Sequence, residues 1–218
     1  MARYEDIVNY KSTTELENGL LKNNFGLEDR EELEQAERLI TNYKLAKLYL
    51  NRTEMKFTVD YYLNIHKILF EDIYPFAGQI RNEVIEKNLP FCLPNFIYSN
   101  LKDTLEKARK LAIRINNEEG LVDVLTYLYS ELDMIHPFRE GNGRVEREFL
   151  RQYVNYVSQY ISFGKYSLDY SNISANEKDG LIQALTIAGA TRELQPLKEY
   201  LRKMLVRTDI EKDNRVRK

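Results

Sequence analysis

The sequence predicts a mainly α-helical domain with one small β-hairpin. Apolar residues recur at helical spacing in segment after segment, whereas only residues 82–98 place β-branched and aromatic residues around a turn. A length of 218 residues suits one domain with a sizeable core. We therefore expect a helical domain at residues 29–207, preceded by an irregular extension at 1–28 and followed by a charged tail at 208–218.

Two helices are expected at the start of the domain. Asp29 can cap the first and Thr58 the second, because their side-chain oxygens can accept from first-turn N–H groups. The apolar positions with helical spacing are Leu33, Ala36, Ile40, Tyr43 and Leu50 in the first helix, and Tyr62, Ile65 and Leu69 in the second. His66 lies among these apolar residues with no carboxylate or cysteine at ligand spacing, so we interpret it as structural rather than as a base or ligand.

Residues 82–98 form the predicted hairpin. Val84 and Ile85 precede the turn-like sequence Lys87-Asn88-Leu89-Pro90, and Phe91 begins the second apolar run. One short hairpin cannot satisfy all of its own backbone hydrogen-bonding groups. An exposed edge here could pair with an extended segment of another protein by strand addition. The alternative is a partly buried connection.

Further helical segments follow the hairpin. The apolar positions are Leu101, Leu105, Ala108, Ala112 and Ile115 in one segment, and Val122, Leu125, Leu128, Tyr129 and Leu132 in the next, which leads directly to His136. From Gly143 the pattern is helical again until Gly164, and a final helical pair is expected at about 174–188 and 193–206.

The composition narrows the class of protein. Lys and Arg number 32 and Asp and Glu number 34, a balance that argues against a dedicated nucleic-acid binder. Cys92 is the single cysteine, which excludes an internal disulfide and fits a reducing cytoplasm. No apolar run approaches the roughly 18–20 residues of a membrane span, and the first residues lack the apolar region of a signal peptide. We expect a soluble, cytoplasmic protein.

The loop between two helical segments carries the sequence HPFREGNGRVER, from His136 to Arg147. Gly141-Asn142-Gly143 can adopt the backbone angles that turn successive N–H groups into an anion-binding nest. The following helix adds its first-turn N–H groups and the positive end of its dipole. Arg144 and Arg147 are three residues apart, so both project near that end. The pattern predicts a polyphosphate site with a histidine and the Glu140 carboxylate beside it.

This block matches, at every fixed position, the signature HPF-x-(D/E)-GNGR-xx-R, so the chain resembles the Fic (Fido) family. The resemblance implies a Fic-fold helical bundle and transfer of AMP from ATP to a hydroxyl side chain of a target protein. The segment from Ile65 to Arg81 also resembles a Fic stretch in which the histidine is not catalytic. By the same resemblance the hairpin is the family's flap, which clamps the target segment beside the catalytic histidine. The flap residues are Val84, Ile85, Glu86, Lys87, Asn88 and Phe91.

Three motif residues have distinct expected roles. His136, with an ordinary pKa near 6.5, is suited to remove the hydroxyl proton as general base at neutral pH. Glu140 offers hard oxygen ligands that suit Mg²⁺ between the α- and β-phosphates. Phe138 is expected to plug into the core and fix the loop. The alternatives are a structural histidine and a carboxylate that only stabilises the helix dipole.

The remaining motif residues are expected to bind the phosphates of ATP. Gly141, Asn142 and Gly143 supply backbone N–H groups, and Arg144 and Arg147 hold the β- and γ-phosphates. Surface salt bridges are the alternative for both arginines. Family members that phosphorylate their targets replace the central glycines, so the intact Gly-Asn-Gly favours AMP transfer, although UMP or GMP transfer stays open.

Many Fic enzymes are inhibited by a helix with the pattern (S/T)-xxx-E-(G/N), whose glutamate pairs with the second motif arginine, here Arg147. Thr13 to Asn18 fits the pattern and would make Glu17 the inhibitory residue, but this stretch is a poor helix former and the pattern is loose. Near the C-terminus, Glu193 has Gly189 where Ser or Thr is required, so that match fails.

Residues from Tyr10 to Glu37 resemble the opening of toxin–antitoxin Fic proteins, in which this stretch packs on the domain. We therefore expect a toxin restrained by a separate small antitoxin that supplies the glutamate, with self-inhibition through Glu17 as the alternative. The resemblance suggests DNA gyrase and topoisomerase IV as targets. A host-directed effector and a catalytically silent nucleotide-binding scaffold are the competing functions.

Overall fold

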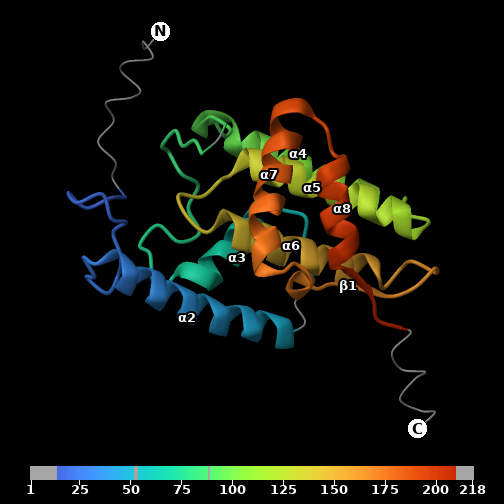
Figure 1. Cartoon of the computed structure of the whole chain (residues 1–218), viewed down its shortest axis with the longest axis horizontal. Coiled ribbons are helices and arrows are strands. Elements are labelled where there is room, and N and C mark those ends of the chain that lie inside the picture. Colours follow the sequence, from blue (N-terminus) through green and yellow to red (C-terminus); the bar gives the residue numbers. More distant parts are fainter. Residues whose placement is uncertain (1–13, 52–53, 88, 210–218) are drawn as a thin grey trace.

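Figure 1 shows the computed structural model of the chain, which describes residues 14–51, 54–87 and 89–209. The helices are α2 (Arg30–Leu50), α3 (Val59–Phe70), α4 (Pro94–Ala112), α5 (Glu118–Ile135), α6 (Asn142–Val157), α7 (Lys178–Thr191) and α8 (Gln195–Met204). Two 3₁₀ turns (Tyr170–Asn172 and Ala175–Glu177) and the strands β1 (Tyr166–Leu168) and β2 (Leu205–Arg207) complete the described elements. The predicted mainly helical fold is confirmed.

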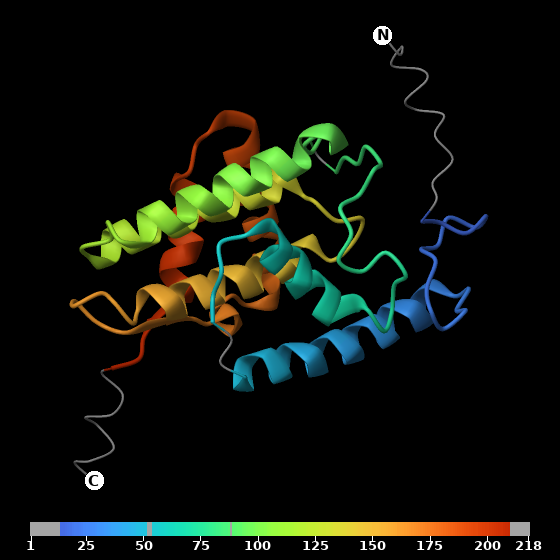
Figure 2. The same ribbon diagram turned by 180° about the vertical axis from the view of Figure 1, so that it is seen from behind.

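The first two helices begin directly after Asp29 and Thr58, the capping residues that were predicted. The Asp29 carboxylate accepts a hydrogen bond from the Glu32 N–H at 3.0 Å, and the Thr58 hydroxyl accepts from the Tyr61 N–H at 3.2 Å. Each bond satisfies one of the first-turn N–H groups that an α-helix leaves without an acceptor. These caps fix the starts of α2 and α3, which lie side by side in both views (Figures 1 and 2).

Helix α5 lies at the centre of the bundle. It contacts α4, α6, α7 and α8, and its apolar side chains Leu125, Leu128 and Leu132 are fully buried. Seen from behind, α4 and α2 run along opposite edges, with α3 and α6 between them (Figure 2). The motif loop joins the end of α5 to the start of α6, so both of its ends are held by the core.

The β structure lies elsewhere than predicted. β1 and β2 form the antiparallel pair, with Ser167 opposite Val206. Within residues 82–98, the described part contains one isolated bridge, between Glu86 and Pro90, and α4 already begins at Pro94. Proline is favoured in the first turn of a helix, where its missing N–H costs nothing. The predicted strand after the turn was therefore wrong, because Ile97 belongs to the buried face of α4.

Residues 14–28 contact the helical domain. Leu20 is buried in the core, and the Asn24 N–H donates to the Ile73 carbonyl at 2.8 Å. Glu15 forms an ion pair with Arg139 of the motif loop. The N-terminal segment therefore lies against the loop. Among the helices of residues 14–209 that are described, none has the length and apolar character needed to cross a bilayer.

Candidate active site

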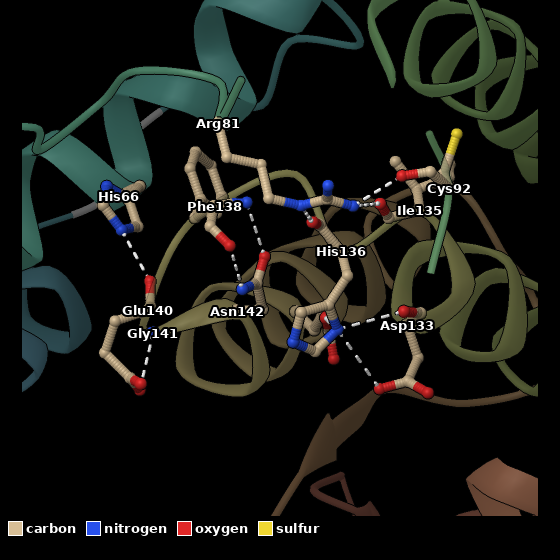
Figure 3. Close-up of polar contacts among 11 residues, drawn as sticks. His66, Arg81, Cys92, Asp133, Ile135, His136, Phe138, Glu140, Gly141 and Asn142 are labelled. Carbon is tan, nitrogen blue, oxygen red and sulfur yellow. Dashed lines mark hydrogen bonds and ion pairs between the residues drawn. The ribbon is translucent and has the colours of Figure 1, made fainter. Parts of the chain in front are cut away.

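His136 ends α5 in a left-handed conformation, with φ of 44°. Its ring Nδ1 lies 3.1 Å from the Asp133 carbonyl oxygen, and Figure 3 draws this contact as a dashed line. A carbonyl can only accept, so Nδ1 carries the hydrogen and Nε2 keeps its lone pair. The Phe91 ring stacks on the imidazole with the centroids 3.8 Å apart. This arrangement fixes both the tautomer and the orientation of a proton-accepting nitrogen.

Burial sets the protonation state of His136. It lowers the pKa to about 4, opposed by the hydrogen bond to the Asp133 carbonyl and assisted by the positive charges of Arg81 and Lys87. The imidazole is therefore neutral at pH 7, as a general base must be.

The side chain of Asn142 closes the motif loop. Its amide oxygen accepts from the Phe138 N–H and its amide nitrogen donates to the Phe138 carbonyl, both at 2.8 Å (Figure 3). Phe138 is fully buried and stacks against His66, with ring centroids 3.9 Å apart. The Asn142 side chain therefore holds the loop in its conformation, a role that was not predicted from the sequence.

His66 supports the loop from α3. Its Nδ1 accepts from the Gly78 N–H at 2.8 Å, so Nε2 must carry the hydrogen that it shares with the Glu140 carbonyl at 3.0 Å. Burial lowers its pKa to about 4, which keeps the ring neutral. Both ring nitrogens are thus occupied by backbone groups, and the interpretation of His66 as structural holds.

Arg81 joins the flap segment to the end of α5. Its guanidinium donates to the carbonyl oxygens of Glu83 (2.6 Å), Cys92 (2.7 Å), His136 (2.7 Å) and Ile135 (3.4 Å). The side chain is almost entirely buried. The bonds to Cys92, Ile135 and His136 join the flap segment to the end of α5 (Figure 3). They thereby hold Phe91, the neighbour of Cys92, where its ring stacks on His136. In the sequence, Arg81 stands only at the end of a stretch that resembles the Fic family, and nothing there indicated this role.

Gly141 begins α6 with a positive φ of 83°. Asn142 and Gly143 follow as the first residues of the helix, where N–H groups have no intrahelical acceptor. A Cβ on Gly143 would lie 3.2 Å from Nη1 of Arg147, so the guanidinium rests against this turn. The expected N–H groups and one motif arginine therefore gather at a single helix N-terminus, a general anion-binding arrangement.

Arg144 points toward α2. Its Nη2 lies 2.7 Å from the Glu37 carboxylate and 3.3 Å from that of Glu140, and its guanidinium lies over the Phe70 ring. The Tyr74 hydroxyl donates to Glu37 in turn. Glu37 is a site residue that the sequence analysis missed, because nothing in its own segment indicates a partner more than 100 positions away.

Two cavities meet at the motif loop. One of about 750 Å³ is lined by His136, residues 140–143, Arg147 and an apolar wall that includes Ile173, Leu181 and Leu185. The other, of about 730 Å³, is lined by Glu37, Arg144 and the N-terminal Leu20, among others. Glu140 and Arg147 line both. Such volumes suit small ligands, and a long anionic ligand could reach from one cavity to the other.

The predicted flap residues and Glu17 do not all line the two cavities. Lys87 and Phe91 line the larger cavity, whereas Val84 and Glu86 are exposed outside it and Ile85 is half-buried. Asn88 lies outside the described residues. Glu17 is exposed on a turn and lines neither cavity.

The half-exposed carboxylate of Glu140 is suited to a divalent cation. One oxygen accepts from the Gly141 N–H at 2.9 Å and lies 3.3 Å from Arg144, which orients the group at the junction of the cavities. A single carboxylate combined with substrate phosphates and water is a usual environment for Mg²⁺. The donor set therefore fits the expected metal.

Comparison with known proteins places this geometry in a family. Residues 56–154 match the model of the Fic/DOC family. The chain is 31% identical over 154 residues to protein adenylyltransferase VbhT of Bartonella schoenbuchensis, covering 70% of this chain and 32% of that protein, about a third of its length. It is 29% identical over 211 residues to the probable protein adenylyltransferase y4lH of Sinorhizobium fredii, covering 94% of this chain and 100% of that protein.

Solved structures agree on the fold. The BepC effector of Bartonella tribocorum, crystallised with AMPPNP, superposes with a TM-score of 0.75 at 19% identity, over 87% of this chain and 93% of that one. A Fic domain from Bartonella quintana with bound ADP gives a TM-score of 0.75 at 21% identity, over 87% and 92%. Residues 56–154 of this chain therefore form a domain of the Fic/DOC family.

Proposed function

We propose that this protein transfers AMP from ATP to a hydroxyl side chain of a target protein. The observation that carries the proposal is the placement of His136: a neutral imidazole with Nε2 available, at the edge of a cavity that also contains the N-terminus of α6. A base and an anion-binding helix end in one cavity are what hydroxyl attack on a phosphate requires. The names of VbhT and y4lH support the same activity.

In the proposed reaction, Nε2 of His136 accepts the hydroxyl proton while the hydroxyl oxygen attacks the α-phosphorus of ATP. A bond forms between that oxygen and phosphorus, and the bond from phosphorus to the oxygen bridging the β-phosphate breaks. Pyrophosphate is the leaving group. The fixed tautomer of His136 orients the accepting nitrogen before the substrate binds, so little reorganisation is needed.

The polyphosphate would lie along the junction of the two cavities. The N–H groups of Asn142 and Gly143 and the guanidinium of Arg147 would bind phosphate oxygens, and Arg144 would bind the far end of the chain. Glu140 would hold Mg²⁺, which supplies neutralisation of phosphate charge when bound. For Arg144 to bind phosphate fully, the nucleotide must compete with the Glu37 carboxylate.

The target segment would enter beside Phe91 and Lys87, which line the larger cavity. Val84, Leu93 and Phe96, which flank Phe91 in the sequence, carry exposed apolar side chains. Such an apolar surface favours a protein substrate over a small hydroxyl compound. The flap residues are accordingly proposed to dock the target next to Nε2 of His136.

We further propose a cytoplasmic toxin restrained by a small antitoxin protein. The smaller cavity exposes Arg144 and Arg147 between α2 and the N-terminal segment, where a partner's glutamate could pair with them. Self-inhibition through Glu17 is the less favoured alternative, because Glu17 faces solvent on a turn. The family resemblance suggests DNA gyrase and topoisomerase IV as targets, and the likeness to Bartonella effector structures keeps a host-directed effector as the alternative.

The test is incubation of the purified protein and Mg²⁺ with a bacterial lysate and ATP labelled at the α- or the γ-phosphate. Protein labelled from α-labelled ATP alone supports AMP transfer, and the mass of the band identifies the target. Label from γ-labelled ATP would indicate phosphorylation and contradict the proposal. Strong labelling by the unmodified chain, equal to that of Glu17→Gly, supports inhibition by a partner, whereas labelling only by Glu17→Gly supports self-inhibition.

A further inference from the structure

Glu146 is a buried acid to which the proposed reaction gives no role. It lies on α6 with 1% of its surface exposed, and neither carboxylate oxygen has a hydrogen-bond partner within the described part of the chain. An isolated carboxylate in such a place is costly unless a proton or a cation neutralises it. The carboxylate of Glu146 is therefore expected to bind a proton or a cation.

Two further donor groups surround the same point. Nδ1 of His136 lies 4.0 Å from Oε1 of Glu146 and 3.9 Å from Oδ1 of Asp133. One donor atom from each of the three residues lies within 4.8 Å of the other two. All three residues line the larger cavity, which gives solutes access to them.

No described lysine or arginine pairs directly with Glu146. Burial, and then the negative charge of Asp133, raise the pKa of Glu146 well above its usual range, while Arg147 opposes the increase. Burial also raises the pKa of Asp133 to about 6, opposed by Lys87. Arg147 and Lys87 therefore do not outweigh the effect of burial on these two carboxyl groups. Neither forms an ion pair with Glu146 within 4.0 Å among the described residues, where His136 is its one such neighbour.

We propose that Asp133, His136 and Glu146 form a binding site for a divalent transition metal, with Zn²⁺ as the best-fitting ion. The site is separate from the Glu140 carboxylate proposed for Mg²⁺. One imidazole nitrogen with two carboxylate oxygens suits Zn²⁺, whereas Mg²⁺ prefers oxygen ligands alone. With zinc–ligand distances of about 2.1 Å, tetrahedral donors lie roughly 3.4 Å apart. Closing the observed spacing therefore requires about 0.5–1.4 Å of side-chain movement.

Such a metal would inhibit the transfer reaction, an inference that rests on the proposed function. Neutral imidazole has one N–H and one lone pair. A metal on Nδ1 uses the lone pair there, so the ring proton must reside on Nε2. Nε2 can then no longer accept the hydroxyl proton of the target. The hydrogen bond from Nδ1–H to the Asp133 carbonyl is lost. AMP transfer is then inhibited without any change in the nucleotide site.

Binding is tested directly with Co²⁺ as a spectroscopic substitute for Zn²⁺, added to the full chain. We expect a visible absorption band that saturates at one Co²⁺ per chain and disappears when Zn²⁺ is added. Glu146→Gln, which has nearly the same size but no charge, should lose the band, and so should Asp133→Asn. Glu140→Gln is the matched control and should retain it. No band in the wild type, or an equal band in Glu146→Gln, would overturn the site.

Two further measurements keep the result interpretable. Cys92→Ser should still bind Co²⁺, because the thiol lies outside the proposed set, and loss of the band in it would overturn the assignment. Thermal unfolding of Glu146→Gln should match the wild type, since the carboxylate makes no hydrogen bond that the change could break. If the amide of Glu146→Gln disturbs packing, Glu146→Leu replaces it. A Glu146→Leu variant that keeps the fold and loses the Co²⁺ band supports the site in the same way.

Inhibition of AMP transfer by Zn²⁺ is measured separately from the binding of Co²⁺. In AMP transfer with excess Mg²⁺, Zn²⁺ should reduce the wild-type rate by about 100-fold or more, the lower range for loss of a general base. Glu146→Gln in the same mixture should be far less sensitive, which also controls for Zn²⁺ bound to ATP. Equal sensitivity of the two proteins would overturn the inhibitory role. If the chain transfers no AMP at all, the proposed function fails while the Co²⁺ titration still decides the metal site.

Discussion

Replacing Gly141 with alanine tests whether the anion-binding turn depends on a missing side chain. Two costs are expected. Gly141 has a φ of +83°, which a residue with a Cβ adopts at a cost of about 1–2 kcal/mol. The added Cβ would also lie 2.5 Å from Cε2 of Phe70, whose fully buried ring has little room to move. Overpacking of this kind costs about 1–3 kcal/mol.

Gly26→Ala provides the matched control. Gly26 also has a positive φ, of +67°, but a Cβ there would meet nothing within 4 Å. It should therefore show the backbone cost alone, about 1–2 kcal/mol, against about 2–5 kcal/mol for Gly141→Ala. For a chain of this size these values correspond to melting temperatures lower by roughly 2–8 °C and 4–20 °C.

Thermal unfolding followed by circular dichroism measures both variants, and Phe70→Leu completes a double-mutant cycle with Gly141→Ala. The steric argument predicts that the double variant loses less stability than the sum of the single changes, by about 0.5–3 kcal/mol. The reasoning is refuted if Gly141→Ala melts no lower than Gly26→Ala, or if the two changes at positions 141 and 70 are additive.

Two other predictions concern His136, the proposed general base, and the contacts that support it. Because burial lowers the pKa of His136 to about 4, the base is deprotonated above that pH, so kcat/KM for AMP transfer should be flat between about pH 6 and 8 and fall only on approach to about pH 4. An acid limb centred near 6.5 would contradict the burial argument. Arg81→Leu should destabilise the fold by about 3–5 kcal/mol, because four carbonyl oxygens lose a buried charged donor, and it should release Phe91 from His136. An unchanged melting temperature in thermal unfolding would show that these bonds do not hold the flap.

The sequence predicted best what is encoded locally. Asp29 and Thr58 cap the helices that they were expected to cap, since a cap involves residues only three positions apart. The motif loop was predictable for the same reason: the residues from His136 to Arg147 are contiguous, and their chemical types already indicate a phosphate site. The left-handed conformation of His136 was not foreseen, because it is imposed by the end of α5 and the loop that follows.

What the sequence did not show depends on contacts between distant segments. Glu37 meets Arg144 only because α2 packs beside the motif, and the role of Arg81 depends on carbonyl groups from two other segments. Glu146 occupies a variable position of the signature, so its convergence with Asp133 was visible only once α5 and α6 were placed together. The strand predicted at residues 91–98 was wrong because Pro94 begins a helix there.

The most direct test of the central claim separates nucleotide binding from transfer in His136→Ala. Binding of an ATP analogue and Mg²⁺ to the wild type and the variant is measured by calorimetry, beside transfer of α-labelled AMP to protein. We predict equal affinity, because Nδ1 of His136 bonds to its own helix and the proposed phosphate donors lie elsewhere. We also predict at least about a 100-fold loss of transfer. Transfer that survives in a variant that binds ATP normally would contradict the assignment of His136 as the base.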